Sequence, residues 1–478
     1  MQTSLSPIIK GLTNYKNENI TRFHMPGHYG KHDFPELKYL CDNILEFDVT
    51  EVEGTDNLNE PTGIILDSLN YIKDTYNSKK SYILVNGSTS GIHIAIDTLV
   101  DDGAHVITAR NCHKSVYNIL DRKNTFIHYI YPKIDETFCI DSHIEYEDLL
   151  ELLNSMEQAS IKIQAVILTY PNYFGRAYDL KKISELLLEK NIYLIIDEAH
   201  GAHFPFHDSL PKSSLSQGST ICIQSAHKTL PSLTQTSMLH LGDSFPDSKI
   251  KLLEDKIQFF QTTSPSYIFT ASCETAVHIM NTYGHSRLEN LKEWIYKFNK
   301  ELSDIPEVNI FENTSNNPDI CHDFCKIGIN TPIPGNILTT ILRNTYKIQA
   351  EMSIGFNVLF MVGISHTEND LLYLKNSIID ILKNNKHLFQ SNFKLNLNNL
   401  YPKTENIFSL NLFKINEKPH FDIITKKIDD IDNDICAEKV IPYPPGIPLL
   451  LPYEIINDNI KQILKYYKFS EIQCFSIG

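Results

Sequence analysis

The stretch CIQSAHKTLPSLTQTSM, Cys222 to Met238, begins in a short apolar run and then turns polar around one lysine, Lys228. The run TICIQ (220–224) is apolar and rich in β-branched residues, which predicts a buried strand. A lysine that ends a core strand either extends its amine toward water or is held inside for chemistry. Because a desolvated amine has a lowered pKa, Lys228 is a candidate nucleophile.

Six other short runs share this apolar, β-rich character, and helical segments separate several of them. In chain order they are SYILV (81–85), HVITA (105–109), TFIHYI (125–130), AVILTY (165–170), IYLIID (192–197) and SMLHL (237–241). Strands that alternate with helices form right-handed βαβ units, and strands that are apolar throughout are typical of a sheet covered on both faces. The sequence therefore predicts an α/β fold with a mostly parallel sheet between two layers of helices.

Changes in residue composition and in the predicted strand–helix pattern divide the chain into three parts. Residues 1–65 are rich in Pro, Gly, Asn and Asp and are predicted to form an irregular N-terminal arm with active-site loops. Residues 66–300 hold the strand–helix alternation and form the predicted large domain. Residues 301–478 are predicted to form a smaller α+β region that contains an asparagine-rich linker at 383–400 and ends in a helix.

The composition excludes several classes of function. A formal net charge of −15 disfavours binding to nucleic acid or to anionic lipid. No apolar leader is visible at the N-terminus, and the apolar runs are too short to span a membrane. Nine scattered cysteines cannot all pair with one another, so we expect a reducing, cytoplasmic setting.

Polar clusters follow several of the predicted strands, where an open α/β sheet forms its binding crevice. NGSTSG (86–91) combines glycines with the hydroxyls of Thr89 and Ser90 at a predicted helix start, which indicates an anion site. Asp197 ends an apolar strand, and such a carboxylate needs a cationic partner. Together with Lys228 these features match what pyridoxal 5′-phosphate (PLP) requires: an amine, a carboxylate for its ring nitrogen and a phosphate cup.

These clusters have two other interpretations, a metal site and an ATPase. The histidines of DEAHGAHF and its neighbourhood, His200, His203 and His207, invite a metal site, but we expect one in the crevice and two with structural roles. CHDFC (321–325) has the wrong spacing for a zinc pair. A helicase-type ATPase requires a phosphate-binding Walker loop that the sequence lacks.

The motifs also occur, in this order, in one family. They are FHMPGH, EVEGTDNL, NGSTSG, RNCHKSV, DEAHGAHF, SAHKTLPSLTQ, TTSPSY and YPPGIPLLLP. From about Phe23 onward the chain resembles the ornithine/lysine/arginine decarboxylases, PLP-dependent enzymes with the aspartate aminotransferase fold. It is most similar to the short Gram-positive type, which has no N-terminal wing domain. DEAHG followed by SxHK is the most specific part of this resemblance.

The resemblance implies a role for each matching residue. Lys228 would hold PLP as an imine, Asp197 would pair with the pyridine nitrogen, and His113 of RNCHKS would stack on the ring. His200 would lie beside the cofactor, and Lys228 or His227 would return a proton to the substrate. The implied phosphate contacts are Thr89, Ser90, Ser225 and His227, with Thr263 of TTSPSY reaching over from the second subunit of a homodimer.

The resemblance implies decarboxylation of a small cationic amino acid in polyamine metabolism. Arginine, giving agmatine, is the first expectation, and lysine and ornithine are the alternatives. Candidate carboxylates for the distal cation of the substrate are Glu51, Glu53, Asp56 and Glu454. Two rivals remain: another PLP reaction such as aminotransfer, for which Arg343 could clamp the α-carboxylate, and a PLP-fold protein that binds or senses without catalysis.

The chain departs from the family pattern at two places. TDNLN (55–59) stands where members often read LDDLH, so an acid and a histidine near the mouth of the site are lost. Tyr453 stands where glycine is common. The first departure bears on substrate identity.

Overall fold

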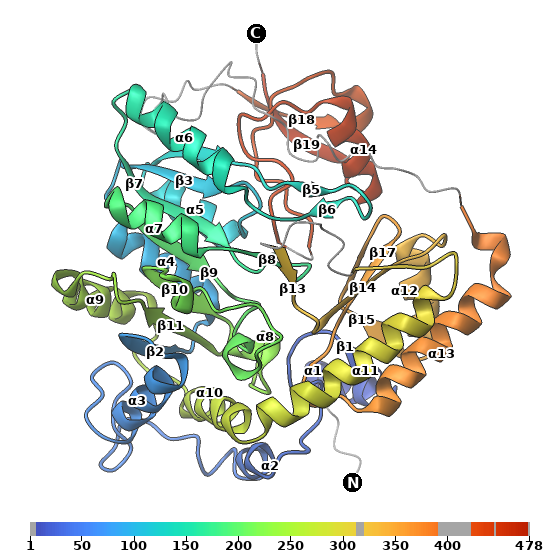
Figure 1. Cartoon of the computed structure of the whole chain (residues 1–478), viewed down its shortest axis with the longest axis horizontal. Coiled ribbons are helices and arrows are strands. Elements are labelled where there is room, and N and C mark those ends of the chain that lie inside the picture. Colours follow the sequence, from blue (N-terminus) through green and yellow to red (C-terminus); the bar gives the residue numbers. More distant parts are fainter. Residues whose placement is uncertain (1–5, 312–319, 391–421, 444–445, 477–478) are drawn as a thin grey trace.

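The computed structural model describes residues 6–311, 320–390, 422–443 and 446–476. A large α/β domain, a smaller sheet domain and a C-terminal unit lie around a common centre (Figure 1). The central sheet has seven strands in the order β2-β11-β10-β9-β7-β3-β4. Its strands are β2 (Lys80–Leu84), β3 (His105–Ala109), β4 (Phe126–Ile130), β7 (Ile163–Thr169), β9 (Tyr193–Asp197), β10 (Ile221–Gln224) and β11 (Ser237–Leu241).

All seven predicted strands are confirmed, each within two residues of its predicted ends. Only β11 runs antiparallel to its neighbours, β10 and β2, so the sheet is mostly parallel as predicted. Strands β7, β9 and β10 lie in the middle of the sheet and are almost entirely buried, because helices cover both faces. The carboxyl ends of these strands therefore open into a single crevice.

The helices of the large domain pack on the two faces of the sheet, with α4 and α5 on one side and α6 and α7 on the other (Figure 1). They are α3 (Ile64–Tyr76), α4 (Gly87–Leu99), α5 (Lys114–Arg122), α6 (Tyr146–Gln158), α7 (Lys181–Glu189), α8 (Ala226–Thr229), α9 (Ile250–Phe260), α10 (Tyr267–Ile279) and α11 (His285–Ser303). Helix α4 is the most deeply buried, since Ile92, Ile94, Ala95 and Ile96 are almost inaccessible to solvent. Its N-terminus is thereby fixed at the crevice.

The prediction that the first 65 residues are irregular is wrong in part. They contain helices α1 (Pro7–Asn17) and α2 (Pro35–Asp42) and strand β1 (Thr21–Phe23). A proline starts each helix, a position where its missing N–H is not needed. Strand β1 pairs in parallel with β15 (Ile348–Ala350), so the arm adds a strand to the smaller domain.

The smaller domain is built on an antiparallel sheet in the order β12-β14-β17-β16. Its strands are β12 (Asn309–Ile310), β14 (Lys326–Asn330), β16 (Met352–Ile354) and β17 (Asn357–Met361), and helices α12 (Gly335–Thr345) and α13 (Glu368–Asn384) pack beside them. A further strand, β13 (Ile320–His322), pairs with β8 (Arg176–Tyr178) of the large domain. That pairing brings the start of β14 to the crevice.

After residue 421 the chain forms a separate C-terminal unit, seen in red in Figure 1. It contains β18 (Ile423–Lys427), α14 (Asp458–Tyr466) and β19 (Glu471–Phe475), and it has its own apolar core. The region expected as one, residues 301–478, thus holds two units, while most of the predicted linker at 383–400 lies outside the described residues. Within the described part of the chain, no helix is long and apolar enough to cross a membrane.

Candidate active site

Lys228 lies in the single-turn helix α8, directly after β10, and its amine lines a pocket at the carboxyl ends of the strands. Its Nζ is 3.3 Å from Nε2 of His200. Burial lowers the pKa of Lys228, while the nearby charges of Asp197 and Glu351 act in the opposite direction. The amine predicted from sequence is therefore in a site that favours its neutral, nucleophilic form.

Asp197 is the last residue of β9 and lines the same pocket. One carboxylate oxygen accepts a hydrogen bond from the amide of Ala199 at 3.2 Å. Burial raises the pKa of Asp197, and the charge of Lys228 and the Ala199 amide oppose that shift. A buried carboxylate with so few donors is suited to holding a cation brought by a ligand.

The hydroxyls at the N-terminus of α4 do not face the crevice as a group. Ser88 lines the pocket and accepts a hydrogen bond from Ser225 at 2.8 Å. Thr89 is exposed, and Ser90 is buried with its hydroxyl donating to the carbonyl of Gly87 at 2.7 Å. The helical turn of about 100° per residue thus favours Ser88, which the sequence reasoning missed.

His113 is the N-cap residue of α5, and its Nδ1 accepts from the amide of Ser115 at 3.2 Å. It lines the pocket with Ile447, which comes from the C-terminal unit. Burial, with the charges of Lys228 and Lys114, lowers the pKa of His113 to about 4, so the ring is neutral. A neutral aromatic ring at this place is suited to stacking on a planar ligand.

None of the five predicted phosphate contacts, Thr89, Ser90, Ser225, His227 and Thr263, is among the described residues that line the pocket. His227 is partly buried, and its Nδ1 donates to the carbonyl of Thr236 at 2.8 Å. Burial lowers the pKa of His227 to about 4, so its Nε2 carries no proton in the single chain. Thr263 is exposed on the segment before α10. Its expected role involves a second subunit and stays a prediction.

His200 lies between two lysines. Its Nε2 faces Lys228, and its Nδ1 is 2.8 Å from Nζ of Lys326, the first residue of β14. Burial and both lysine charges hold the pKa of His200 well below its usual range. Lys326 was not predicted, because CHDFCKIGI carries no pattern that marks its lysine as an active-site residue.

The other two histidines considered for a metal site, His203 and His207, have different partners. His203 is 3.1 Å from Asp323, and His207 is 2.6 Å from Glu289. Asp323 and Cys325 of CHDFC do lie near His203, with one potential ligand atom of each within 4.8 Å of the others. Asp323 Oδ1 already accepts from the amide of Cys325 at 2.9 Å and faces His203.

Two of the carboxylates considered for the substrate have other partners. Asp56 accepts backbone hydrogen bonds from Thr62, Gly63 and Ile65 at 2.8–3.0 Å. Burial acts to raise the pKa of Asp56, but the hydrogen bonds from the amides outweigh it and lower the pKa to about 2. Glu454 is fully buried and forms a bidentate pair with Arg110 at 2.8 and 2.9 Å. Glu51 and Glu53 do not line the pocket.

The departure at Tyr453 has a conformational explanation. Its φ is +73°, a region in which glycine is the least strained residue. In this chain the tyrosine ring stacks on Phe475 with centroids 4.7 Å apart. Stacking of this kind stabilises the unfavourable backbone conformation.

These side chains fit PLP. Lys228 supplies an amine for its aldehyde, Asp197 a buried carboxylate for its ring nitrogen, and His113 a neutral ring beside the plane. Ser88 and Ser225 place hydroxyls at the N-terminus of α4, where helix amides favour a phosphate.

Comparisons with known proteins agree with this site. The family model of the Orn/Lys/Arg decarboxylase major domain matches residues 6–326, and that of the C-terminal domain of the same family matches residues 420–474. The Bacillus subtilis protein YaaO is 29% identical over 96% of this chain and 93% of its own length. The arginine decarboxylase of Halalkalibacterium halodurans is 27% identical over 95% of this chain and 91% of its own length.

Solved structures show the same fold. The lysine decarboxylase of Francisella novicida has a TM-score of 0.72 at 18% identity and covers 98% of this chain and 83% of its own. The ureidoglycine-glyoxylate aminotransferase of Bacillus subtilis has a TM-score of 0.60 at 13% identity over 78% of this chain and 96% of its own. The fold and the resemblance predicted from sequence are confirmed: this chain belongs to the Orn/Lys/Arg decarboxylase family of PLP-dependent amino acid decarboxylases.

Proposed function

We propose that this enzyme removes carbon dioxide from arginine to form agmatine. The similar proteins named arginine decarboxylase support this choice, because those of Halalkalibacterium halodurans and Bacillus subtilis are 27% identical and matched over 91–93% of their length. The proteins named lysine decarboxylase from Hafnia alvei and Escherichia coli are 22–24% identical and matched over 75–77%. Lysine and ornithine are the alternative substrates.

The observation that carries decarboxylation over aminotransfer is the chemistry of the pocket lining. Among the described residues that line it, none is an arginine. Transamination needs the α-carboxylate held firmly, whereas decarboxylation is favoured when that group is left poorly solvated. Arg343, the residue considered for a clamp, lies on α12 and pairs instead with Glu18 at 2.7 Å.

Each residue of the site has a defined task in this proposal. PLP, when bound, supplies the electron sink that accepts the bonding pair released with carbon dioxide. Lys228 would hold the aldehyde of PLP, and its Nζ, when it is not bound in this way, would be available to carry a proton. Asp197 would keep the ring nitrogen protonated, and Ser88 and Ser225 would hold the phosphate. His113 fixes the ring plane.

The proposal includes a cytoplasmic homodimer, in which Thr263 of one subunit reaches the phosphate bound by the other. Its exposure in the single chain supports this, since the hydroxyl is free to meet a second subunit. Glu51 and Glu53, on the exposed loop before α3, are the remaining candidates for contact with the distal cation of the substrate.

The test measures carbon dioxide release by the purified enzyme with arginine, lysine and ornithine in parallel, together with keto-acid formation. We expect release from arginine without keto acid, and loss of both the visible imine band and the activity in Lys228→Ala. Release from lysine or ornithine alone would correct the substrate. Keto acid without carbon dioxide would overturn decarboxylation.

A further inference from the structure

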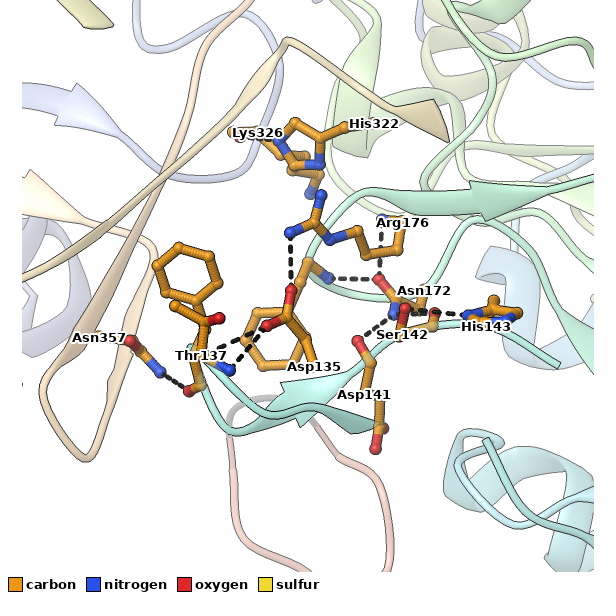
Figure 2. Close-up of polar contacts among 12 residues, drawn as sticks. Asp135, Thr137, Asp141, Ser142, His143, Asn172, Arg176, His322, Lys326 and Asn357 are labelled. Carbon is orange, nitrogen blue, oxygen red and sulfur yellow. Dashed lines mark hydrogen bonds and ion pairs between the residues drawn. The ribbon is translucent and has the colours of Figure 1, made fainter. Parts of the chain in front are cut away.

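Lys326 is a second lysine at the back of the active site, and its backbone is held on several sides. It is 1% exposed and pairs with Met361 in the β14–β17 ladder. Its amide donates to the backbone carbonyl of Asp323 at 2.9 Å, and its own carbonyl lies 2.8 Å from Nε2 of His322. Figure 2 shows Lys326 and His322 beside the ion pair of Arg176 with Asp135, which is 3.0 Å long.

The aliphatic part of the Lys326 side chain packs against Gly175, where the absence of a side chain provides the space. A Cβ atom at Gly175 would lie 2.8 Å from both Cβ and Cγ of Lys326, so no larger residue fits there without movement. Further along the side chain, Nζ lies 5.6 Å from the ring centroid of Tyr173. The amine is thus guided to His200, where it meets Nδ1 at 2.8 Å.

The position of His200 between two amines restricts where protons can be. An ammonium group has donors and no lone pair, so a protonated Lys326 requires Nδ1 of His200 to accept. The neutral ring then carries its proton on Nε2, which points toward Lys228 at 3.3 Å. That hydrogen bond needs a lone pair on the Lys228 amine. One protonated lysine on one side of His200 therefore favours a neutral lysine on the other.

The charges around the pair agree with this arrangement. Burial lowers the pKa of Lys326 to about 8, opposed by Glu351 and Asp323 and assisted by the charge of Lys228. The groups whose charges act on one or both of the lysines are Asp197 at the end of β9, Asp323 and Cys325 before β14, and Glu351 after β15. The lysine charges in turn lower the pKa values of His200, of His113 at the start of α5 and of His227 on α8. Because the charge of Lys228 acts on Lys326 and both amines face His200, we expect the two amines to titrate as a coupled pair.

We propose that Lys228 and Lys326 share one proton through His200, so that Lys326 is a positioning residue which takes up the proton of Lys228. In the forward direction the Lys228 ammonium gives its proton to Nε2, and the proton on Nδ1 passes to the Lys326 amine. The ring remains neutral, and the reverse movement returns the proton. The proposal rests on the assignment of Lys228 as the aldehyde-binding amine and is independent of which amino acid is the substrate.

The test measures the protonation of Lys228 directly. The full-length chain, freed of cofactor, is treated with trace acetic anhydride at a series of pH values, and acetylation of the Lys228 peptide is measured by mass spectrometry. We expect the wild-type profile to begin below the ordinary lysine range of about 10.4 and to rise in two steps, because two coupled amines titrate. A single step at the ordinary lysine pH would overturn the proposal without any variant.

Three variants separate charge from proton transfer. Lys326→Met removes both, so the profile should move up by about one pH unit, with about tenfold less acetylation at pH 8. Lys326→Arg keeps the charge but cannot give up its proton, so Lys228 should titrate in one step at or below the wild-type range. Lys375→Met, which replaces another buried lysine that pairs with Glu301, should leave the profile unchanged.

Equal profiles for wild type, Lys326→Met and Lys326→Arg would overturn the proposal. If Lys326→Met does not fold, Lys326→Gln, whose amide can donate to Nδ1 but cannot take a proton, replaces it and should also titrate in one step. These readouts need no substrate, so a failed carbon dioxide assay beside the expected profiles would overturn the proposed reaction alone.

Discussion

The large domain contacts each of its two neighbours through a buried cation, and the two cations have different bonding partners. Arg110 meets the C-terminal unit with all three of its guanidinium nitrogens: it pairs with Glu454 and donates to the carbonyls of Pro448 and Leu449 at 2.7 and 3.2 Å. Lys326 of the smaller domain meets His200 and the face of Tyr173, and its nearby carboxylates do not bond to it directly in any described contact.

The difference shows that a buried cation which joins two units and a buried cation which can change its charge need different partners. Burial acts against the Arg110 charge, but Glu454 outweighs it and raises the pKa of Arg110, so the guanidinium stays charged at every accessible pH. Lys326, without a bonded carboxylate, has a pKa of about 8 and can change its charge near neutral pH. A fully paired arginine holds two units together, and an incompletely paired lysine can take part in proton transfer.

Removing Glu454 should have the largest effect. Glu454→Gln leaves the Arg110 charge buried without its partner, which should lower the free energy of unfolding by about 3–5 kcal/mol. Urea denaturation measures this. The double variant Arg110→Met, Glu454→Leu should recover most of the loss, since an apolar pair of similar volume replaces the ion pair. A loss below about 1 kcal/mol in the single variant would contradict the assigned role.

Lys326→Met should change how stability depends on pH. The pKa of Lys326 is depressed in the folded state, from 10.5 to about 8, so the unfolded chain binds more protons between these values. The wild type should therefore lose stability as the pH falls from about 10.5 to about 8, by up to about 3 kcal/mol relative to Lys326→Met. Urea denaturation at several pH values measures the slope, and parallel lines for the two proteins would contradict it.

Gly175→Ala tests the packing against Lys326. Gly175 has a φ of +85°, and the added Cβ would lie 2.8 Å from the lysine stem. We expect a loss of about 1–3 kcal/mol in the free energy of unfolding. Gly54→Ala is the matched control, because its φ is +95° and nothing lies within 4 Å. Equal losses in the two variants would assign the whole effect to backbone strain.

Arg343→Ala should have the smallest effect. Its ion pair with Glu18 joins the N-terminal arm to α12, and the two side chains are 24% and 39% exposed. Solvent screens such pairs, so we expect a change of about 0–1 kcal/mol in the free energy of unfolding. A loss as large as that of Glu454→Gln would contradict the expectation that a partly exposed ion pair contributes little to stability.

The sequence predicted what depends on local pattern. Strands His105–Ala109 and Ser237–Leu241 have their predicted ends, because apolar runs of that length have few alternatives in a covered sheet. Lys228 and Asp197 were found because each directly follows or ends such a run. Helices α1 and α2 were missed, since α1 contains Pro, Gly and Asn and α2 begins with Pro, residues that are also typical of loops.

The rest of the site depends on contacts between distant parts of the chain. Arg110 and Glu454 are separated by 344 positions, and His200 and Lys326 by 126, so neither pair leaves a local signal. The choice of Ser88 over Thr89 depends on helix rotation, which a run of three hydroxyl residues does not define. Residues that close an active site between domains are hard to predict for this reason.

The pairing of β1 with β15 has a consequence for synthesis on the ribosome. The chain emerges from its N-terminus, but Thr21–Phe23 finds its partner only when Ile348–Ala350 has been made. Until then the arm has no strand to pair with, so the large domain must complete its sheet first. Strand β1 is thus made well before the strand with which it pairs, and it joins the N-terminal arm to the smaller domain only once both exist.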